Sequence, residues 1–300
     1  MQLPNPVYLA IPGFILLLAA EMLYGRRSGK IRFEARDTAA SLAMGIGSLG
    51  TGMAFGFIFL AYAGTVRPYR VADIGWSWST IAICFVLDDM LYYWWHRAAH
   101  RVRWLWAAHV NHHSSQHYNL STALRQPWTS AFTPGLIFKT PLIILGFPLG
   151  MMAFVSGANL VYQYWIHTEA IGRMPRAFEW LMNTPSHHRA HHATNPRYLD
   201  TNYAGVFIIW DRMFGTFVAE DPADVPKYGI VKNLASFNPL IIAFHEWLAI
   251  GRDLLRARSP RDAAGTLLAP PGWRPDGQGE TTDAIKARWT AAHQGGDIAA

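Results

Sequence analysis

Ten of the 13 histidines gather at four places in the sequence. These are His96 and His100, then His109, His112 and His113, then His167, and finally His187, His188, His191 and His192. Residues three or four apart share one face of a helix, so these spacings bring the imidazoles of a cluster together. Imidazole binds zinc, copper, iron and nickel. Eight to ten imidazoles exceed the capacity of one ion, so the pattern predicts a site for two metal ions.

The last cluster is predicted to lie on a short helix with defined ends. Thr184 can cap its start, with Pro185 at the first helical position, and Asn195-Pro196 stops it. The first two clusters cannot share one straight helix, because a continuous helix would point His100 and His109 in opposite directions. We therefore expect a bend or break between them.

Three further residues are candidates for catalytic or supporting roles. Positions 89, 93, 96 and 100 lie on one helical stripe. An acid inside an apolar segment is a functional candidate. We therefore expect Asp89 to orient a ligand histidine, directly or through Tyr93. Asn183 and Tyr203 flank the last cluster and are candidate pocket residues.

The elements that must hold these side chains are apolar. Hydrophobic residues make up 51% of the 300 residues and charged residues 15%, against about 25% charged in a typical soluble domain. The single cysteine excludes a disulfide scaffold. Long uncharged runs predict transmembrane helices. The predicted spans lie near residues 6–24, 40–63, 76–95, 129–146 and 149–167, with Lys139 inside the fourth.

Basic loops set the predicted orientation. The loop after the first span carries five basic residues and the loop after the second only Arg67 and Arg70. The positive-inside rule then places the first loop in the cytoplasm, and all four histidine clusters emerge on that face. The fold prediction is an all-α integral membrane protein with four to five transmembrane helices and a cytoplasmic helical cap that holds the di-metal site. The compact chain with short loops favours a bacterial inner membrane.

The chain divides into three predicted parts. Residues 1–70 hold the N-terminal spans and residues 75–220 the catalytic region. Residues 221–300 form a cytoplasmic C-terminal segment with an amphipathic helix at 239–258, lying on the membrane, a short helix at 282–293 and a flexible tail. The net charge of +6 is concentrated beside the spans, so it indicates contact with anionic lipid and not with nucleic acid.

The clusters and their flanks resemble the fatty acid hydroxylase/sterol desaturase superfamily of integral-membrane di-iron enzymes. The strings that carry the resemblance are HVNHHSSQHYNLSTALRQ at 109–126, WIHTE at 165–169, NTPSHHRAHH at 183–192, NYAGVFIIWDRMFGTF at 202–217, FNP at 237–239 and PGW at 271–273. Together they look like the alkylglycerol monooxygenase branch, and they cover about residues 75–275.

The resemblance implies a helical bundle with a cytoplasmic cap over two iron ions, and all ten clustered histidines match the family's ligands. It also implies an oxygenase that uses O₂ and electrons from an external donor, either a redox protein or a reduced pterin. Hydroxylation beside an alkylglycerol ether oxygen releases a fatty aldehyde, whereas a sterol or acyl chain would be hydroxylated or desaturated. Animal members depend on tetrahydrobiopterin and carry an acid directly after the first cluster. Arg101 stands there in this chain, which leaves the pterin open.

Other classes use the same ligand type. A zinc-binding membrane hydrolase or a structural metalloprotein also binds through histidine, and an isolated membrane enzyme can acquire zinc in place of iron. A zinc hydrolase needs a carboxylate base near its ligands, and the sequence contains no HExxH. A metal transporter would carry its histidines along the spans. The sequence does not indicate the oligomeric state.

Overall fold

The computed structural model describes residues 3–294, which form helices joined by irregular segments. Within this range there is no strand, only two isolated bridges, so the all-α prediction is confirmed there. The α-helices are α1 (Pro6–Ser28), α2 (Ala35–Val66), α3 (Trp78–Arg101), α4 (Arg103–His113), α5 (Leu120–Ala123), α6 (Thr140–Leu145), α7 (Leu149–Trp165), α8 (Arg176–Leu181), α9 (Pro185–His191), α10 (Ile209–Met213), α11 (Pro239–Arg256), α12 (Pro260–Leu268) and α13 (Thr282–Gln294).

Two helices are long and apolar enough to cross a membrane. They are α1 and the run Ala35–Tyr69, which is α2 extended by a short 3-10 turn. Asn5 caps the start of α1 by accepting a hydrogen bond from Val7 N, and Gly29 ends the helix in the left-handed conformation. Helices α3 and α7 also form close to the predicted bounds, and their crossing of the bilayer stays a prediction.

The fourth predicted span, 129–146, is wrong as a single membrane-crossing helix. The segment forms 3-10 turns at Ser130–Phe132 and Pro134–Lys139 before the short helix α6. Its apolar helical part, Pro134–Leu145, is shorter than the roughly 20 residues a span needs. The prolines at 134 and 141 occupy helix starts within the segment, which divides it.

Lys139 explains how this segment sits beside the longer helices. Its ammonium group pairs with Asp88 on α3 and donates a 2.9 Å hydrogen bond to Ser156 Oγ on α7. Ser156 Oγ also donates to Asp88. A charge inside an apolar region requires such partners. The sequence predicts Lys139 inside an apolar span, and the carboxylate of Asp88 is the counter-charge that stabilises the ammonium group there.

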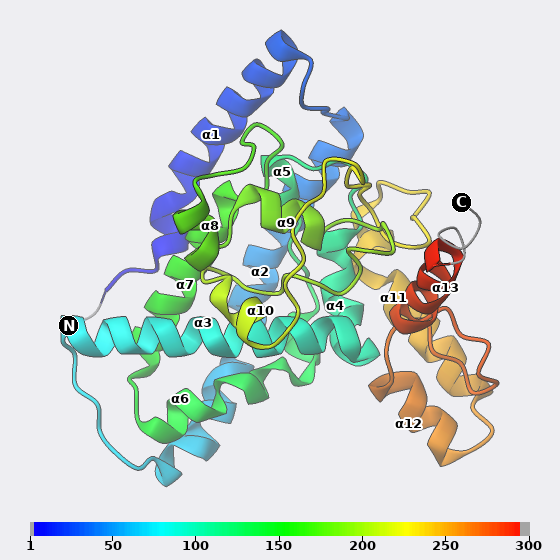
Figure 1. Ribbon diagram of the computed structural model, residues 1–300. Coiled ribbons are helices and arrows are strands. Elements are labelled where there is room, and N and C mark those ends of the chain that lie inside the picture. The colour runs from blue at the N-terminus through cyan, green and yellow to red at the C-terminus, as the bar shows by residue number, and fades with distance from the viewer. Residues whose placement is uncertain (1–2, 295–300) are drawn as a thin grey trace.

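Helix α3 runs through the middle of the molecule and carries the first histidine cluster at its C-terminal end (Figure 1). It packs against α7, which in turn packs against α1. Cys84, Met151 and Val155 are buried in the apolar cluster that joins α3 to α7. This packing fixes the direction in which the end of α3 points.

The predicted break between the first two histidine clusters is confirmed. Val102 has φ −124° and ψ 114°, which ends α3 and starts α4. Helix α4 then folds back against α3. The extended residue turns the second cluster toward the same centre as the first.

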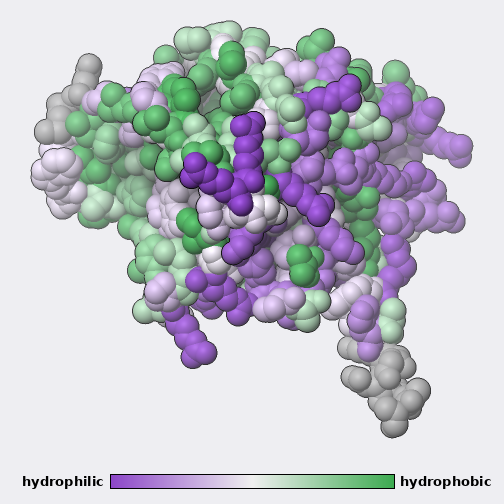
Figure 2. All heavy atoms as spheres, turned by 90° about the horizontal axis from the view of Figure 1, so that it is seen from above, coloured by the Kyte–Doolittle hydropathy of each residue, from purple (hydrophilic) through white to green (hydrophobic). Residues whose placement is uncertain are grey.

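The C-terminal segment folds against the rest of the chain. Helix α11 is amphipathic, as predicted: Ile242, Ala243 and Ile250 are buried, whereas Leu248 and Leu255 are exposed. Its placement on a membrane stays a prediction. The short helix predicted at 282–293 is confirmed as α13, whereas α12 forms where no helix was predicted. Residues 295–300 of the predicted flexible tail lie outside the described range. Figure 2 shows apolar residues on the left half, the side of α1 and α7 in Figure 1, and hydrophilic residues on the right, the side of α11–α13.

Gly146, between α6 and α7, gives a test of this fold. It has φ +96°, and a Cβ there would collide with the carbonyl of Ala72. Gly146→Ala should therefore cost at least about 2 kcal/mol of unfolding free energy, from backbone strain plus the clash, and lower the thermal unfolding midpoint in detergent. Gly64→Ala on α2 is the control, because nothing lies within 4 Å of its site. Equal midpoints for both variants would contradict the described turn.

Candidate metal centre

Nine of the ten clustered histidines converge at one place, in two adjacent groups. The five-histidine group consists of His96, His100, His109, His113 and His191, and the four-histidine group of His112, His167, His188 and His192. In each group one nitrogen per residue lies within 4.8 Å of the others, and all nine side chains are buried. The groups touch where the rings of His113 and His192 stack with centroids 4.3 Å apart. The protein thus presents two donor sets side by side.

Four helices deliver these side chains. The C-terminal end of α3 supplies two histidines and α4 supplies three. The segment just after α7 supplies one, and α9 with its C-cap residue supplies three. Thr184 stands at the N-cap of α9 with Pro185 at its first position, as predicted. Its hydroxyl, however, donates to Glu179 Oε1 and not to the backbone of the helix.

Backbone carbonyls fix the orientation of three of the rings. The Nδ1–H groups of His96, His191 and His167 donate to carbonyl oxygens at 2.7, 2.8 and 2.7 Å. The acceptors are the carbonyls of Tyr203, Thr201 and Gln163. Because a carbonyl can only accept, the proton of each ring is on Nδ1, and the bare lone pair is on Nε2, toward the other imidazoles. This is the arrangement found in protein metal ligands.

The contacts among the Nε2 atoms show that the residues fit a cation. In the five-histidine group, His109 Nε2 lies 2.8 Å from His96 Nε2 and 3.2 Å from His113 Nε2, which lies 3.2 Å from His191 Nε2. An imidazole nitrogen carries at most one proton, and His96 and His191 carry theirs on Nδ1. At most two of these three contacts can then be hydrogen bonds.

The four-histidine group has the same shortage of protons. His167 Nε2 lies 3.1 Å from His112 Nε2 and 3.0 Å from His188 Nε2, which lies 3.2 Å from His192 Nε2. A metal ion at the centre of each group accepts every lone pair at once. The donor chemistry therefore fits one transition-metal ion in each group.

The protonation state of these residues suits metal binding. Burial, with the neighbouring histidines adding to its effect, lowers the pKa of His109, His113, His191 and His192 well below the ordinary value. These imidazoles are neutral at pH 7, so a metal ion need not displace a proton to bind them.

His187, the tenth predicted ligand, is not brought into either group. Its Nε2 lies 4.0 Å from Glu179 Oε2, and its ring packs edge-on against Phe217. Burial lowers its pKa to about 4. On the short helix α9 its neighbour His188 faces the four-histidine group, so His187, about 100° away around the axis, faces elsewhere.

Asp89 does not orient a ligand histidine in the predicted way. Its fully buried carboxylate accepts hydrogen bonds from Val206 N at 2.8 Å, Phe207 N at 3.0 Å, Trp210 Nε1 at 2.9 Å and Asn159 Nδ2 at 2.7 Å. Asp89 thereby fixes the loop at 203–210. That loop contains the carbonyl that accepts from His96, so the action on the histidine runs through the backbone.

The route through Tyr93 is also wrong, because its hydroxyl bonds to Thr216 Oγ1 at 3.0 Å. Tyr203 contributes its carbonyl to His96, and its ring centroid lies 5.3 Å from that of His100. Asn183 supports the same loop: its Nδ2 donates to the carbonyls of Ala204 and Gly205. Neither the Asn183 nor the Asp89 side chain forms a hydrogen bond with any of the nine histidines.

Two supporting residues escaped the sequence reasoning. Asp211 accepts from Tyr203 N and Ala204 N, both at 2.8 Å, and so holds the carbonyl that His96 uses. Arg189, between the histidines of α9, donates to both carboxylate oxygens of Glu220 and to the carbonyls of Thr168 and Ile171. It ties α9 to the segment that follows His167. The position of this arginine between two pairs of histidines was the available sequence signal.

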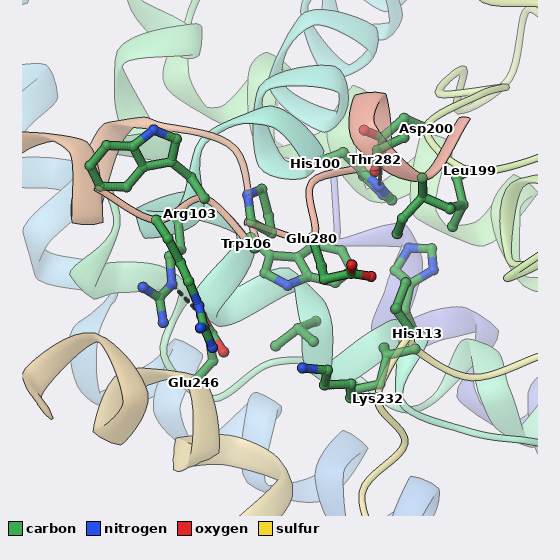
Figure 3. A pocket seen from close by; sticks show the side chains of 18 of the residues that line it. His100, Arg103, Trp106, His113, Leu199, Asp200, Lys232, Glu246, Glu280 and Thr282 are labelled. Atoms are coloured by element: carbon green, nitrogen blue, oxygen red, sulfur yellow. Dashed lines mark hydrogen bonds and ion pairs between the residues drawn. The ribbon is translucent and has the colours of Figure 1, made fainter. Parts of the chain in front are cut away.

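A cavity of about 710 Å³ reaches the histidines from the side of the C-terminal segment. His100, His113, His191 and His192 line it together with Glu280 and Trp273 of the C-terminal segment. Trp106, Lys232 and Glu280, all drawn in Figure 3, are among its lining residues. The cavity gives the metal centre a polar side as well as an apolar one.

Two adjacent all-histidine donor sets, at the ends of apolar helices, are the arrangement typical of a histidine-box metalloprotein. Residues 81–216 match the family model for fatty acid hydroxylase. The resemblance inferred from the histidine clusters is confirmed.

Several curated proteins are similar to the chain over most of its length. It is 37% identical to alkylglycerol monooxygenase of Homo sapiens over 282 residues, which is 91% of the chain and 61% of the relative. The corresponding protein of Danio rerio is 37% identical over 278 residues, with the same coverage. Ornithine lipid hydroxylase of Rhizobium tropici is 24% identical over 220 residues, 71% of the chain and 66% of the relative. The chain thus spans about three fifths of the alkylglycerol monooxygenases. No solved structure matches it significantly.

Neighbouring histidines on α9 test the assignment of the groups. His188→Ala should reduce the bound metal from about two ions to about one per chain, because it removes a member of the four-histidine group. His187→Ala should keep both ions. Metal analysis of the purified variants would measure this, and equal losses from the two variants would refute the described grouping.

The buried carboxylate of Asp89 predicts a large effect on stability. Asp89→Ala leaves four buried donors without an acceptor, which should cost about 3–5 kcal/mol. The thermal unfolding midpoint in detergent measures this cost. Asp73→Ala is the control, because Asp73 is solvent-exposed and pairs only with Arg70, so little change is expected. An unchanged midpoint for Asp89→Ala would show that the carboxylate does not hold the loop.

Proposed function

We propose that the chain is a membrane-bound di-iron oxygenase that hydroxylates a C–H bond of a lipid. The observation that carries the proposal is the pair of all-histidine donor sets, in a chain 37% identical over 91% of its length to an alkylglycerol monooxygenase. The donor sets supply a place for two ions, and the relatives indicate a lipid substrate. The proposed location is a membrane, with the metal centre on the cytoplasmic face.

Iron fits the donor chemistry, and its bound form would supply O₂ activation. Neutral imidazoles leave each ion its full positive charge. Among the described residues neither group contains a carboxylate or thiolate, so the zinc hydrolase lacks the base it would need. In the overall reaction a lipid C–H, O₂, two electrons and two protons give an alcohol and water. The electrons come from an external redox protein or a reduced pterin.

The chain's own residues bind, orient and exclude water. All nine histidines are buried, which keeps bulk water from the centre. The carbonyls of Tyr203, Thr201 and Gln163 fix the orientation of three imidazole rings. Asp89 and Asp211 hold the loop that carries the Tyr203 carbonyl. Rigid support of this kind keeps ligands in a productive geometry.

The proposed substrate is an alkylglycerol ether. Hydroxylation of the alkyl carbon next to the ether oxygen gives a hemiacetal, which collapses to a fatty aldehyde and glycerol. Sterol or fatty-acyl hydroxylation or desaturation is the alternative within the same family, supported by the more distant ornithine lipid hydroxylase.

An isotope experiment tests this function. The protein in nanodiscs, loaded with Fe(II) under anaerobic conditions, is given ¹⁸O₂, a reductant and a 1-O-alkylglycerol, a sterol or a fatty acid in separate reactions. We expect labelled fatty aldehyde from the ether, reduced at least about 100-fold in His188→Ala. A labelled alcohol from the sterol or the fatty acid, with no aldehyde from the ether, would show that the substrate is not an alkylglycerol. Lipid hydrolysis that needs no O₂ would overturn the oxygenase.

A further inference from the structure

His100 is the one ligand-group histidine that faces a carboxylate among the described residues. Its Nδ1 lies 3.4 Å from Asp200 Oδ1, and its Nε2 is buried without a hydrogen-bond partner. The other nitrogen is thus free to serve as the ligand atom. The fixed rings in both groups use neutral backbone carbonyls instead. A carboxylate behind an imidazole raises its basicity more than a carbonyl does.

Asp200 is held in place by an unusual local backbone. It has φ +53° and Asn202 has φ +55°, and these are the two non-glycine residues with positive φ among the described residues. Between them, the carbonyl of Thr201 accepts from His191. Such strained residues persist where the surroundings fix them, and they concentrate at functional sites. Residues 200–202 therefore orient two members of the five-histidine group.

The C-terminal helix reaches this tripeptide through Arg101. One terminal nitrogen of Arg101 lies 3.2 Å from Asp200 Oδ2. The same guanidinium donates to both carboxylate oxygens of Asp283, at 2.8 and 2.6 Å. Thr282, at the start of α13, lies beside Asp200 and His100 (Figure 3). A continuous chain of contacts thus runs from α13 through Arg101 and Asp200 to a buried imidazole.

Asp283 also determines how many N–H groups of Arg101 can donate to Asp200. With Asp283 present, both terminal nitrogens of the guanidinium are occupied by that carboxylate, and only one also reaches Asp200. Without Asp283, the full fork is free to bind Asp200 in the bidentate way that arginine prefers. The carboxylate would then turn its charge toward Arg101 and away from His100.

We propose that Asp200 is a positioning residue for His100 and that docking of α13, through Asp283 and Arg101, controls how tightly the five-histidine group retains its metal ion. This inference rests on the two metal sites of the proposed function. The four-histidine group has no carboxylate partner among the described residues, so the coupling is confined to one of the two ions. The C-terminal segment, which also lines the cavity, is thereby linked to the metal centre.

Metal release tests the coupling. The full chain in detergent, loaded with Co(II) or Fe(II), is mixed with excess chelator and the release of each ion is followed in time. In Asp200→Asn and Asp283→Asn we expect one of the two ions to leave roughly 10–100-fold faster, the range typical of a lost outer partner, while the other keeps its native rate. Asp283→Glu should restore most of the retention. The Co(II) absorption spectrum should change for one site only.

Arg288→Gln is the matched control. It breaks the exposed ion pair between Arg288 and Glu280 at the same helix but leaves Arg101 untouched, so native release is expected. Release of both ions at equally increased rates, or native release from Asp283→Asn even when proteolysis shows α13 detached, would overturn the inference. A native chain that binds no metal would instead overturn the proposed function, so the two failures are distinguishable.

Discussion

Each neutral imidazole offers one proton and one lone pair, and nine of them buried at one place cannot satisfy one another. Three rings donate a hydrogen bond from Nδ1–H to a backbone carbonyl, which leaves an unprotonated Nε2 directed at the neighbouring rings. Burial lowers the pKa of His109, His113, His191 and His192, so protonation of these rings at neutral pH does not relieve the shortage. Two metal ions relieve it completely. The rest of the structure can be understood as the means of holding these nine side chains where only cations satisfy them.

Several elements far apart in the sequence share this task. The extended residue Val102 turns α4 back along α3, so that four histidines from these two helices join His191 of α9 in the five-histidine group. Asp89 and Asp211 anchor the loop at 203–210 through its backbone N–H groups, and Arg189 fastens α9 to the segment after α7. These supports are charged, buried and fully bonded, which makes them rigid. Because these supports hold the histidines rigidly, the apolar helices can adjoin the histidine groups on one side and the polar cavity can adjoin them on the other.

Local patterns in the sequence predicted much of this arrangement, because they depend on helix geometry alone. The spacing within each cluster, the break before His109 and the amphipathic helix at 239–258 follow from the period of the helix. Features that depend on distant partners could not be predicted. His187 has the right spacing, but its neighbour His188 is the residue on α9 that faces the four-histidine group, so His187 points elsewhere. Asp89 lies on the right stripe, but four donors from other segments take its carboxylate. The apolar run at 129–146 has the right composition, but its prolines divide it and Lys139 ties it to Asp88.

The most direct test of this account is to locate the metal. The protein, purified without oxygen from iron-replete cells, would be crystallised and its anomalous scattering measured at the iron edge. The account predicts two peaks, one inside the five-histidine group and one inside the four-histidine group. A single peak, or peaks away from these histidines in a preparation that oxidises lipid, would contradict it.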